Sequence, residues 1–354
     1  MMQVKPSQLF EILKAAFVKG LNVLVVGGPG IAKSSIVAQA ARAVEADIVI
    51  SNPAVEDPTN GAGLPWVSGD KKTATFLPFG QLAKVLGATK LTVWDLEDLG
   101  NASGAVQAGY MHWLLAKELN GHKLPDCVRM VATTNRRTDR TGVSGILESV
   151  KSRFAIIVEL VPDLDEWSNW YVQQDFMSPE ILAYLRATRA EAGPEDAVGM
   201  LYQFTPSADI VNCPLPRTWE HASRVLQLGL SPAAEAAALA GAVGDKAATA
   251  FLGFRRMYRE LPSLEGIIMD PDNAAIPDNL SALYAVSTGL AYMANENNFD
   301  QVAKYVQRMY NAGRGDFAVL CIRDATRKTP VLQQTPAFAI IMASEIGQLV
   351  VGAA

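Results

Sequence analysis

The sequence contains few cysteines and histidines, and those present are scattered. No CxxC pair joins its three cysteines, which are Cys127, Cys213 and Cys321. This spacing argues against a disulfide framework and favours a reducing, cytoplasmic environment. The three histidines are equally dispersed, whereas a zinc site needs clustered ligands. We therefore expect no zinc centre.

Long apolar runs and a strong net charge are also missing. A helix that crosses a bilayer needs about 20 apolar residues, and Glu235 and Glu345 interrupt the two most apolar tracts. We expect no membrane association and, because MMQVKPSQLF has no apolar core, no secretory signal. The net charge of −5 is mild and argues against bulk attraction to nucleic acid, leaving only a local basic groove for such binding.

The chain does have strand-like apolar runs that alternate with helical patterns. The runs are LNVLVVG, DIVIS, LTVWDLE, CVRMVATTN and FAIIVELV, and helical stretches at 104–119 and 144–153 separate the later ones. Alternating strands and helices predict an α/β fold with a parallel, doubly wound sheet. Within this half, LPWVSGDKKTATFLP (64–78) reads as a hairpin.

Beyond residue 162 the pattern becomes helical. We predict an α/β nucleotide-binding core over residues 1–162, an all-helical lid over 163–261 and a helical C-terminal extension over 262–354. In the extension, the apolar spacing predicts helices at 280–296, 299–311 and about 336–350.

A phosphate-binding loop follows the first apolar run. GGPGIAKS matches the template G-x-x-x-x-G-K-[ST] except at Ala32, which adds only a β-carbon. Glycines let backbone N–H groups face a phosphate, and the helix N-terminus adds partial positive charge. Lys33 would reach the β- and γ-phosphates and Ser34 would ligate Mg²⁺. The residues expected to contact ATP are Gly27, Gly28, Pro29, Gly30, Ile31, Ala32, Lys33, Ser34 and Ser35.

Three acids crowd the end of another strand, in LTVWDLEDLGNAS. A phosphate loop needs one acid for the metal and a second that polarises water. Glu97 and Asp98 are adjacent and point to opposite sides, which suits those two roles. Asp95 would lie inside the strand, where a charge is costly unless paired. It could instead be the metal acid, with Glu97 acting on water, although the two would then share a face.

Three polar residues follow in the order that a nucleotide-hydrolysing site would need. Asn135 ends the strand VRMVATTN, where it could bond the γ-phosphate or its water. Arg153 lies where a helix meets the next strand, and Arg217 opens a helix after Pro216. Taken singly, Asn135 is more often a turn residue and each arginine a solvated charge.

Together these residues resemble the AAA+ ATPases, specifically the MoxR-like branch. GGPGIAKS resembles that branch's phosphate loop, and EDLGNASGAVQAGY its acidic segment, in which paired acids lead through Gln107 into a helix. VATTNR is similar to sensor 1, ESVKSRF to the helix that ends in an arginine finger, and LPRTWEHASRVL to the sensor 2 helix. The resemblance covers residues 5–230, and the tail matches more loosely.

The resemblance implies a role for each position. Lys33 and Ser34 would bind phosphate and Mg²⁺, as the loop already suggested. The resemblance also makes Glu97 the metal acid, Asp98 the catalytic acid and Asn135 sensor 1. Arg217 would contact the γ-phosphate from the lid. Arg153 would enter the site of a neighbouring subunit, which implies a ring, usually a hexamer.

The sequence departs from the family pattern at the paired acids. The usual Asp-Glu order is reversed at Glu97–Asp98, so a shorter carboxylate would face the water and hydrolysis could be slow. Rival candidates for the arginine that acts in trans are Arg136, Arg137 and Arg140. The hairpin lies where this branch carries an insertion, and its Trp66 and Phe76 either contact a partner or only pack onto the core.

Three functions share this core. The leading hypothesis is an ATP-driven ring that remodels a partner protein, as MoxR-like proteins act with von Willebrand A-type partners. The second is a nucleic-acid motor or helicase loader, for which the sequence offers neither a basic patch nor an added DNA-binding domain. The third, prompted by the reversed acids, is a nucleotide-gated scaffold with negligible turnover.

Overall fold

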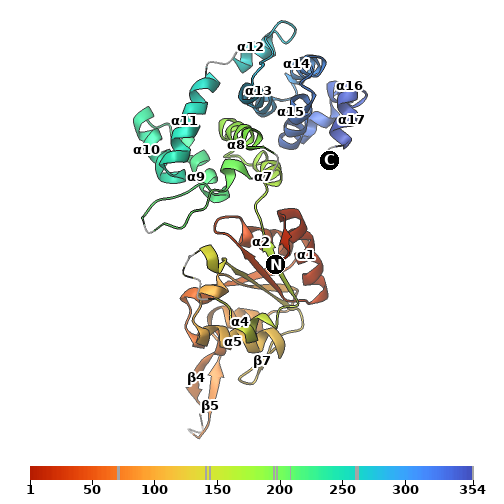
Figure 1. Cartoon of the computed structure of the whole chain (residues 1–354). Coiled ribbons are helices and arrows are strands. Elements are labelled where there is room, and N and C mark those ends of the chain that lie inside the picture. The colour runs from red at the N-terminus through yellow and green to blue at the C-terminus, as the bar shows by residue number, and fades with distance from the viewer. Residues whose placement is uncertain are drawn as a thin grey trace. The chain divides into compact units, whose positions relative to one another are not determined.

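The computed structural model describes residues 1–69, 72–139, 142, 145–193, 196, 198–207, 209–259 and 263–352. The chain divides into two compact units (Figure 1). The first comprises Met1–Pro162 with Phe204–Ala208, and the second comprises Asp163–Gln203 with Asp209–Ala354. None of the helices in the described part of the chain has the length and apolar character that a membrane span requires.

A six-stranded parallel sheet forms the centre of the first unit. Its spatial order is β1-β10-β2-β9-β6-β3. The strands are β1 (Gln3–Val4), β2 (Val23–Gly27), β3 (Asp47–Ser51), β6 (Thr92–Leu96), β9 (Val128–Thr134) and β10 (Ile156–Leu160). Each of the five apolar runs contributes one strand, so the expected parallel α/β fold is confirmed. The two-residue β1 is too short to give a sequence pattern.

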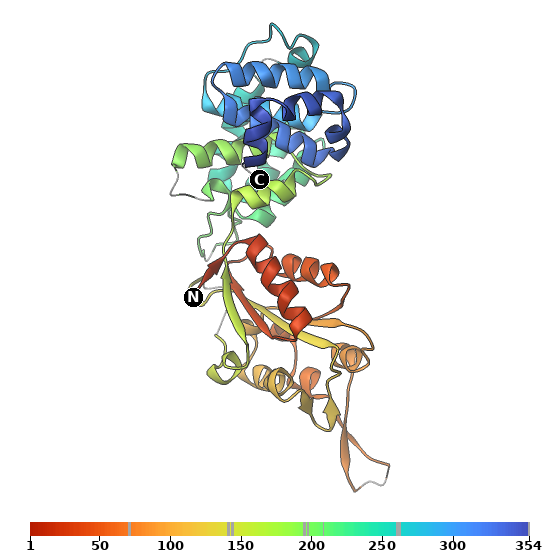
Figure 2. The ribbon, with the colours of Figure 1, turned by 90° about the vertical axis from the view of Figure 1, so that its right-hand side faces the viewer.

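Helices cover both faces of this sheet, which Figure 2 shows from the side. On one face, α1 (Pro6–Lys19) packs on α2 (Lys33–Ala43), and α2 contacts β3, β6 and β9. On the other face, Trp94 of β6 packs edge-on against Tyr110 of α5 (Gly104–Leu115), with ring centroids 5.5 Å apart. Because side chains alternate along a strand, Asp95 belongs to the face opposite Trp94.

Shorter elements complete the first unit. They are η1 (Pro53–Val55), α3 (Pro58–Ala62), α4 (Gly80–Leu86), η2 (Leu99–Asn101), β7 (Glu118–Leu119), β8 (His122–Lys123), η3 (Arg137–Asp139) and α6 (Glu148–Lys151). Two helix predictions were too long: α5 ends at Leu115, and the helix expected over 144–153 is the four-residue α6. Residues 143 and 144 lie outside the described part of the chain.

The expected hairpin forms and projects from the first unit (Figure 1). β4 (Leu64–Val67) pairs antiparallel with β5 (Ala74–Leu77), and Trp66 lies opposite Thr75. Trp66 is 59% exposed, so it does not pack into the core, whereas Phe76 is half-buried. The Phe76 carbonyl lies 2.6 Å from Nε2 of His122, which ties the hairpin base to β8. The expected turn at Ser68–Asp70 is described only to Gly69.

The second unit is helical, as predicted. Its elements are α7 (Leu164–Tyr171), α8 (Pro179–Ala192), η4 (Gly199–Leu201), α9 (Pro216–Leu226), α10 (Pro232–Val243), α11 (Asp245–Arg259), α12 (Leu264–Met269), α13 (Leu280–Met293), α14 (Phe299–Asn311), α15 (Gly315–Lys328), η5 (Pro330–Gln334), α16 (Pro336–Met342) and α17 (Glu345–Gly352). The single helix expected at about 336–350 is therefore two helices, α16 and α17.

Buried polar contacts join α8 to the C-terminal helices. Arg186 of α8 forms an ion pair with Asp324 of α15, and both side chains are almost fully buried. The same guanidinium donates to the Thr288 hydroxyl of α13 at 3.3 Å. The helices of 163–261 and those of 262–354 thus lie in one compact unit and share a buried charged contact.

Candidate nucleotide site

The predicted phosphate loop connects β2 to α2. Gly27 ends β2, where an added β-carbon would lie 2.9 Å from the Leu160 carbonyl oxygen, so any other residue would push β10 away. Gly30 has a φ of 67°, in the left-handed region that glycine adopts most easily. The first N–H groups of a helix have no partner within the helix. At α2 the N-cap residue supplies no side-chain cap either, so these donors suit an anion.

Ala32 is the N-cap residue of α2 and has a φ of 71°. The template glycine at this position is therefore explained by the left-handed backbone, which costs an alanine about 1–2 kcal/mol. The interpretation of Ala32 as an added β-carbon with little chemical effect omitted this backbone cost. The alanine side chain is exposed and meets no steric obstacle.

Lys33 links the loop to the neighbouring strand. Its side chain is 9% exposed, and its Nζ donates to the carbonyl oxygens of Gly27 (3.1 Å) and Gly28 (2.8 Å). The same Nζ donates to Oδ1 of Asn135 at 2.7 Å. Asn135 directly follows β9, which pairs with β2. Two predicted site residues, 102 positions apart, are thus in direct contact.

The acids lie at the same edge of the sheet. β6 pairs with β9, and in a parallel sheet the carboxyl ends of adjacent strands lie side by side. Glu97 and Asp98 come directly after β6 and are both partly exposed. Asp98 has a left-handed φ of 52°, which Asp tolerates better than most residues. Its backbone turns there into η2, so the side-chain alternation expected for a continuing strand does not extend to this position.

Asp95 lies inside β6 and is fully buried. Neither carboxylate oxygen has a hydrogen-bond partner within the described residues. Burial raises the pKa of Asp95 well above its usual range, and the charges of Glu97 and Asp98 raise this pKa further. A buried acid without a partner is costly, and this cost marks Asp95 as a residue that a cation or a proton must balance.

The acids and Ser34 fit a magnesium ion better than a metal that needs a full set of protein ligands. Among the described residues, no three His, Cys, Asp or Glu side chains gather into a ready-made metal cage. Mg²⁺ keeps several waters and uses one or two carboxylates together with substrate phosphates. Ser34, half-buried in the first turn of α2, supplies a hydroxyl, and Asp95 and Glu97 supply carboxylate oxygens at the end of β6.

The candidate trans arginines differ in their contacts. Arg136 is held by Asp139 (Nε–Oδ2 3.1 Å) and Glu159 (Nη1–Oε1 3.2 Å), so it has a structural role in the first unit. Arg137 lies exposed in η3. Arg153 follows α6, donates from Nη1 to its own helix at the Ser149 carbonyl, and leaves Nε without a partner in the described part of the chain. Arg140 lies outside the described residues.

Arg217 lies in the second unit, in the first turn of α9. It is exposed, whereas Pro216, Thr218 and Trp219 beside it are buried. The Trp219 indole donates to the Met200 carbonyl at 2.8 Å, which fixes this face of α9 inside the unit. Arg217 is consequently directed away from the core of its own unit.

Sequence reasoning missed the role of one buried residue, Gln107. The sequence places it only within the acidic segment, yet its amide bonds the backbone of Ala102, Gly145 and Leu147. The available signal was a lone amide among apolar residues of α5, and that pattern alone does not identify the partners.

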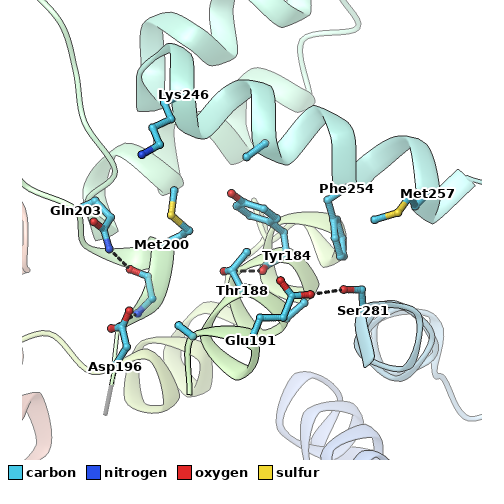
Figure 3. A pocket seen from close by; sticks show the side chains of 14 residues that line it. Tyr184, Thr188, Glu191, Asp196, Met200, Gln203, Lys246, Phe254, Met257 and Ser281 are labelled. Carbon is cyan, nitrogen blue, oxygen red and sulfur yellow. Dashed lines mark hydrogen bonds between the residues drawn. The ribbon is translucent and has the colours of Figure 1, made fainter. Parts of the chain in front are cut away.

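The second unit has a cavity of its own, of about 430 Å³ (Figure 3). Tyr184 and Glu191 of α8 line it together with Phe254 of α11, and Ser281 donates to Glu191 at 3.1 Å. None of the predicted site residues is among its described lining residues. This cavity is therefore separate from the residues discussed above.

Comparison with known proteins finds only distant matches. No protein-family model matches the chain, and no curated protein matches it. The RuvB Holliday junction branch migration motor of Thermotoga maritima is 14% identical with a TM-score of 0.34, over 94% of this chain and 89% of that one. NtrX from Brucella abortus in complex with ADP is 14% identical with a TM-score of 0.35, over 97% of this chain and 66% of that one. Similarity at this level carries no functional information.

The fold class follows from the topology and the loop. Strands β10-β2-β9-β6-β3 run parallel, and the phosphate loop joins the central β2 to α2. A helical region follows the sheet. The chain has an α/β fold with a P-loop-type connection between β2 and α2, followed by a helical C-terminal region.

Proposed function

We propose that this chain binds ATP with Mg²⁺ and hydrolyses it, as a cytoplasmic AAA+ ATPase of the MoxR-like type. The observation that carries this proposal is the contact between Lys33 and Asn135 at the uncapped N-terminus of α2. It places a buried ammonium, the backbone donors of a helix N-terminus without a side-chain cap, and a polar amide at one sheet edge, next to the strand that ends in the acids.

Each residue has a defined chemical task. The N–H groups of residues 28 and 30–34 and the Lys33 ammonium bind the phosphates, and Lys33 exchanges carbonyl oxygens for phosphate oxygens when it does so. Ser34 and Glu97 hold Mg²⁺, with Asp95 as the alternative acid, and the ion neutralises phosphate charge. Asp98 takes a proton from the attacking water, and Asn135 orients that water or the γ-phosphate.

The proposal extends to a ring that remodels a partner protein. Arg153 is partly exposed at the end of α6, available to the site of a neighbouring copy, and Arg217 acts from the helical lid. The hairpin offers exposed Leu64, Trp66 and Leu77 on one of its faces, which supports a protein contact. A von Willebrand A-type protein is the partner we propose, and a hexamer is the assembly.

The test measures ATP turnover and oligomer mass together. The wild type should hydrolyse ATP only with Mg²⁺ and should form a larger oligomer with ATP at micromolar concentration. Lys33→Ala should lose both properties. Lys90→Ala, which removes an exposed pair with Asp47, is the matched control and should retain them. A wild type that stays monomeric with ATP and Mg²⁺ would contradict the ring.

A nucleotide-gated scaffold is the second candidate. It is favoured by the shorter Asp98 in the position proposed for the catalytic acid and by its left-handed backbone. In that case Lys33→Ala abolishes ATP binding, whereas Asp98→Asn leaves an already negligible turnover unchanged. Stimulation of turnover by DNA or RNA would instead identify a nucleic-acid motor.

A further inference from the structure

Gln107 is a polar side chain in an otherwise apolar part of α5. It is 1% exposed, and its helix neighbours Val106, Tyr110 and Trp113 all belong to the core beneath the sheet. Burying an amide there costs free energy unless its donors and its acceptor are satisfied. The bonds that Gln107 makes therefore explain why this position carries an amide.

All three bonds of Gln107 go to backbone groups. Nε2 donates to the carbonyl oxygen of Ala102 at 3.1 Å and to that of Gly145 at 2.9 Å. Oε1 accepts from the N–H of Leu147 at 3.0 Å. Ala102 ends η2, the turn that follows Glu97 and Asp98. Gln107 thus joins the acid loop, which we define as residues 97–102, to the segment 145–147.

The segment 145–147 sets the start of α6. Leu147 is the N-cap residue of that helix and has no side-chain cap of its own. Val150 of α6 is fully buried, and the N–H of Arg153 donates to the Val150 carbonyl at 3.1 Å. A shift at Leu147 would consequently move Arg153.

A backbone hydrogen bond and a shared cavity also lie at this junction between η2 and the segment 145–147. The N–H of Gly145 donates to the carbonyl of Gly100 in η2 at 3.3 Å, parallel to the Gln107 bridge. Gln107, Gly145 and Leu147 also line a cavity of about 570 Å³ together with Asn135. The junction therefore borders the residue that contacts Lys33.

We propose that Gln107 is a positioning residue that couples the acid loop to α6, so that nucleotide bound at the acids fixes where Arg153 lies. The coupling rests on the proposed function, because it needs nucleotide at this site. Gln107 itself touches no substrate. The Gln107 amide bonds both Ala102 and the segment 145–147. A displacement of the backbone at Ala102 therefore moves this side chain, and the side chain in turn moves Gly145 and Leu147.

Hydrogen–deuterium exchange on the full chain tests the coupling, with a non-hydrolysable ATP analogue and Mg²⁺ as the probe. In the wild type, the analogue should slow exchange in residues 27–35 and also in residues 145–153. In Gln107→Leu, protection of 27–35 should persist, whereas the added protection of 145–153 should fall at least about three- to tenfold, the net value of one of the three buried hydrogen bonds that this variant removes. Turnover should fall through kcat, with KM nearly unchanged.

Two companion variants separate coupling from folding. Gln107→Met removes the same three bonds while keeping the length of the side chain, so it should lose the response as Gln107→Leu does and serves if Gln107→Leu does not fold. Asn22→Ala removes a similar amide bond to α5, at the Leu114 carbonyl, far from the acids along the helix. It should keep the full response.

The outcomes distinguish this inference from the proposed function. Protection of 27–35 without any change at 145–153 in the wild type overturns the coupling and leaves ATP binding intact. A response that survives in Gln107→Leu, or that is lost equally in Asn22→Ala, also overturns it. If the analogue protects neither segment in the wild type, the proposed function fails and the coupling fails with it.

Discussion

Lys33 donates a hydrogen bond of 2.7 Å from Nζ to Oδ1 of Asn135, which joins the start of α2 to the end of β9. The same ammonium also donates to the carbonyl oxygens of Gly27 and Gly28. These three acceptors are neutral. Phosphate oxygens carry full negative charge and form stronger, charge-assisted bonds, so they can replace these acceptors without breaking a salt bridge among them.

Asn135→Asp should therefore weaken nucleotide binding. The new carboxylate would pair with the Lys33 ammonium and compete with phosphate, and a charge-assisted bond of about 1.5–3 kcal/mol corresponds to a loss of roughly tenfold or more in affinity. Asn135→Ala, the control, should leave affinity nearly unchanged and slow turnover. Titration with a fluorescent ATP analogue measures the affinity of both variants. Unchanged affinity in Asn135→Asp would contradict the role given to this contact.

Ala32→Gly should stabilise the protein. Glycine removes the left-handed strain of alanine at φ 71°, although it adds freedom to the unfolded chain, so the net gain should be about 0.5–1 kcal/mol. Ala38→Gly, in the interior of α2, is the matched control and should destabilise by about 1 kcal/mol. Urea unfolding compares the two, and effects of the same sign would show that strain at Ala32 is absent.

The sheet could be predicted from the sequence because buried parallel strands give continuous apolar runs. The loop and Asn135 were found in the same way, since each directly follows such a run. Gln107 was not assigned a role, because its function depends on three backbone groups brought together only by folding. The single helix expected at 336–350 was wrong for a similar reason, since apolar spacing continues across the break between α16 and α17.

The burial of Asp95 could be anticipated, but its lack of partners could not. Position inside an apolar run predicts burial, whereas a hydrogen-bond partner could have come from any part of the chain. The structure supplies none in the described residues. If Asp95 is the metal acid, a bound cation offsets the cost of burying its carboxylate, so Mg²⁺ should change the stability of the protein through Asp95.

Exchanging the two adjacent acids should raise turnover. In the double variant Glu97→Asp with Asp98→Glu, the longer carboxylate would reach further toward the attacking water. Positioned general bases contribute about 10²–10⁴-fold, so recovery of even part of this factor should give at least about tenfold in kcat. Glu97→Gln should lose Mg²⁺-dependent turnover altogether. A double variant slower than the wild type would show that the reversed order is already matched to this backbone.

Asp95 should make stability depend on pH. Its folded-state pKa is raised by burial and by the charges of Glu97 and Asp98, so the folded protein holds this proton more tightly than the unfolded chain. The resulting stabilisation is fully present below the unfolded value of 3.8 and is lost as pH rises through the folded pKa. The free energy of unfolding of the wild type should thus fall, relative to Asp95→Asn, as the pH increases.

Urea unfolding at a series of pH values above 3.8, with a chelator present, measures the difference in the free energy of unfolding between the wild type and Asp95→Asn. Adding Mg²⁺ without nucleotide then separates the two metal assignments. If Asp95 holds the ion, Mg²⁺ should stabilise the wild type at neutral pH and leave Asp95→Asn unaffected. A constant difference at every pH would show that Asp95 keeps its ordinary pKa in the folded protein.

The ion pair between Arg186 and Asp324 should be a major support of the helical unit. Asp324→Ala leaves a buried guanidinium without its charge partner, which costs about 3–5 kcal/mol. Asp278→Ala is the matched control: Asp278 is fully exposed and lies 3.5 Å from Arg314, so its loss should cost far less than the loss of Asp324. The double variant Arg186→Met with Asp324→Leu replaces both charges by apolar groups and should recover most of the loss. Urea unfolding distinguishes these cases, and equal costs for Asp324→Ala and Asp278→Ala would show that this pair does not hold α8 to α15.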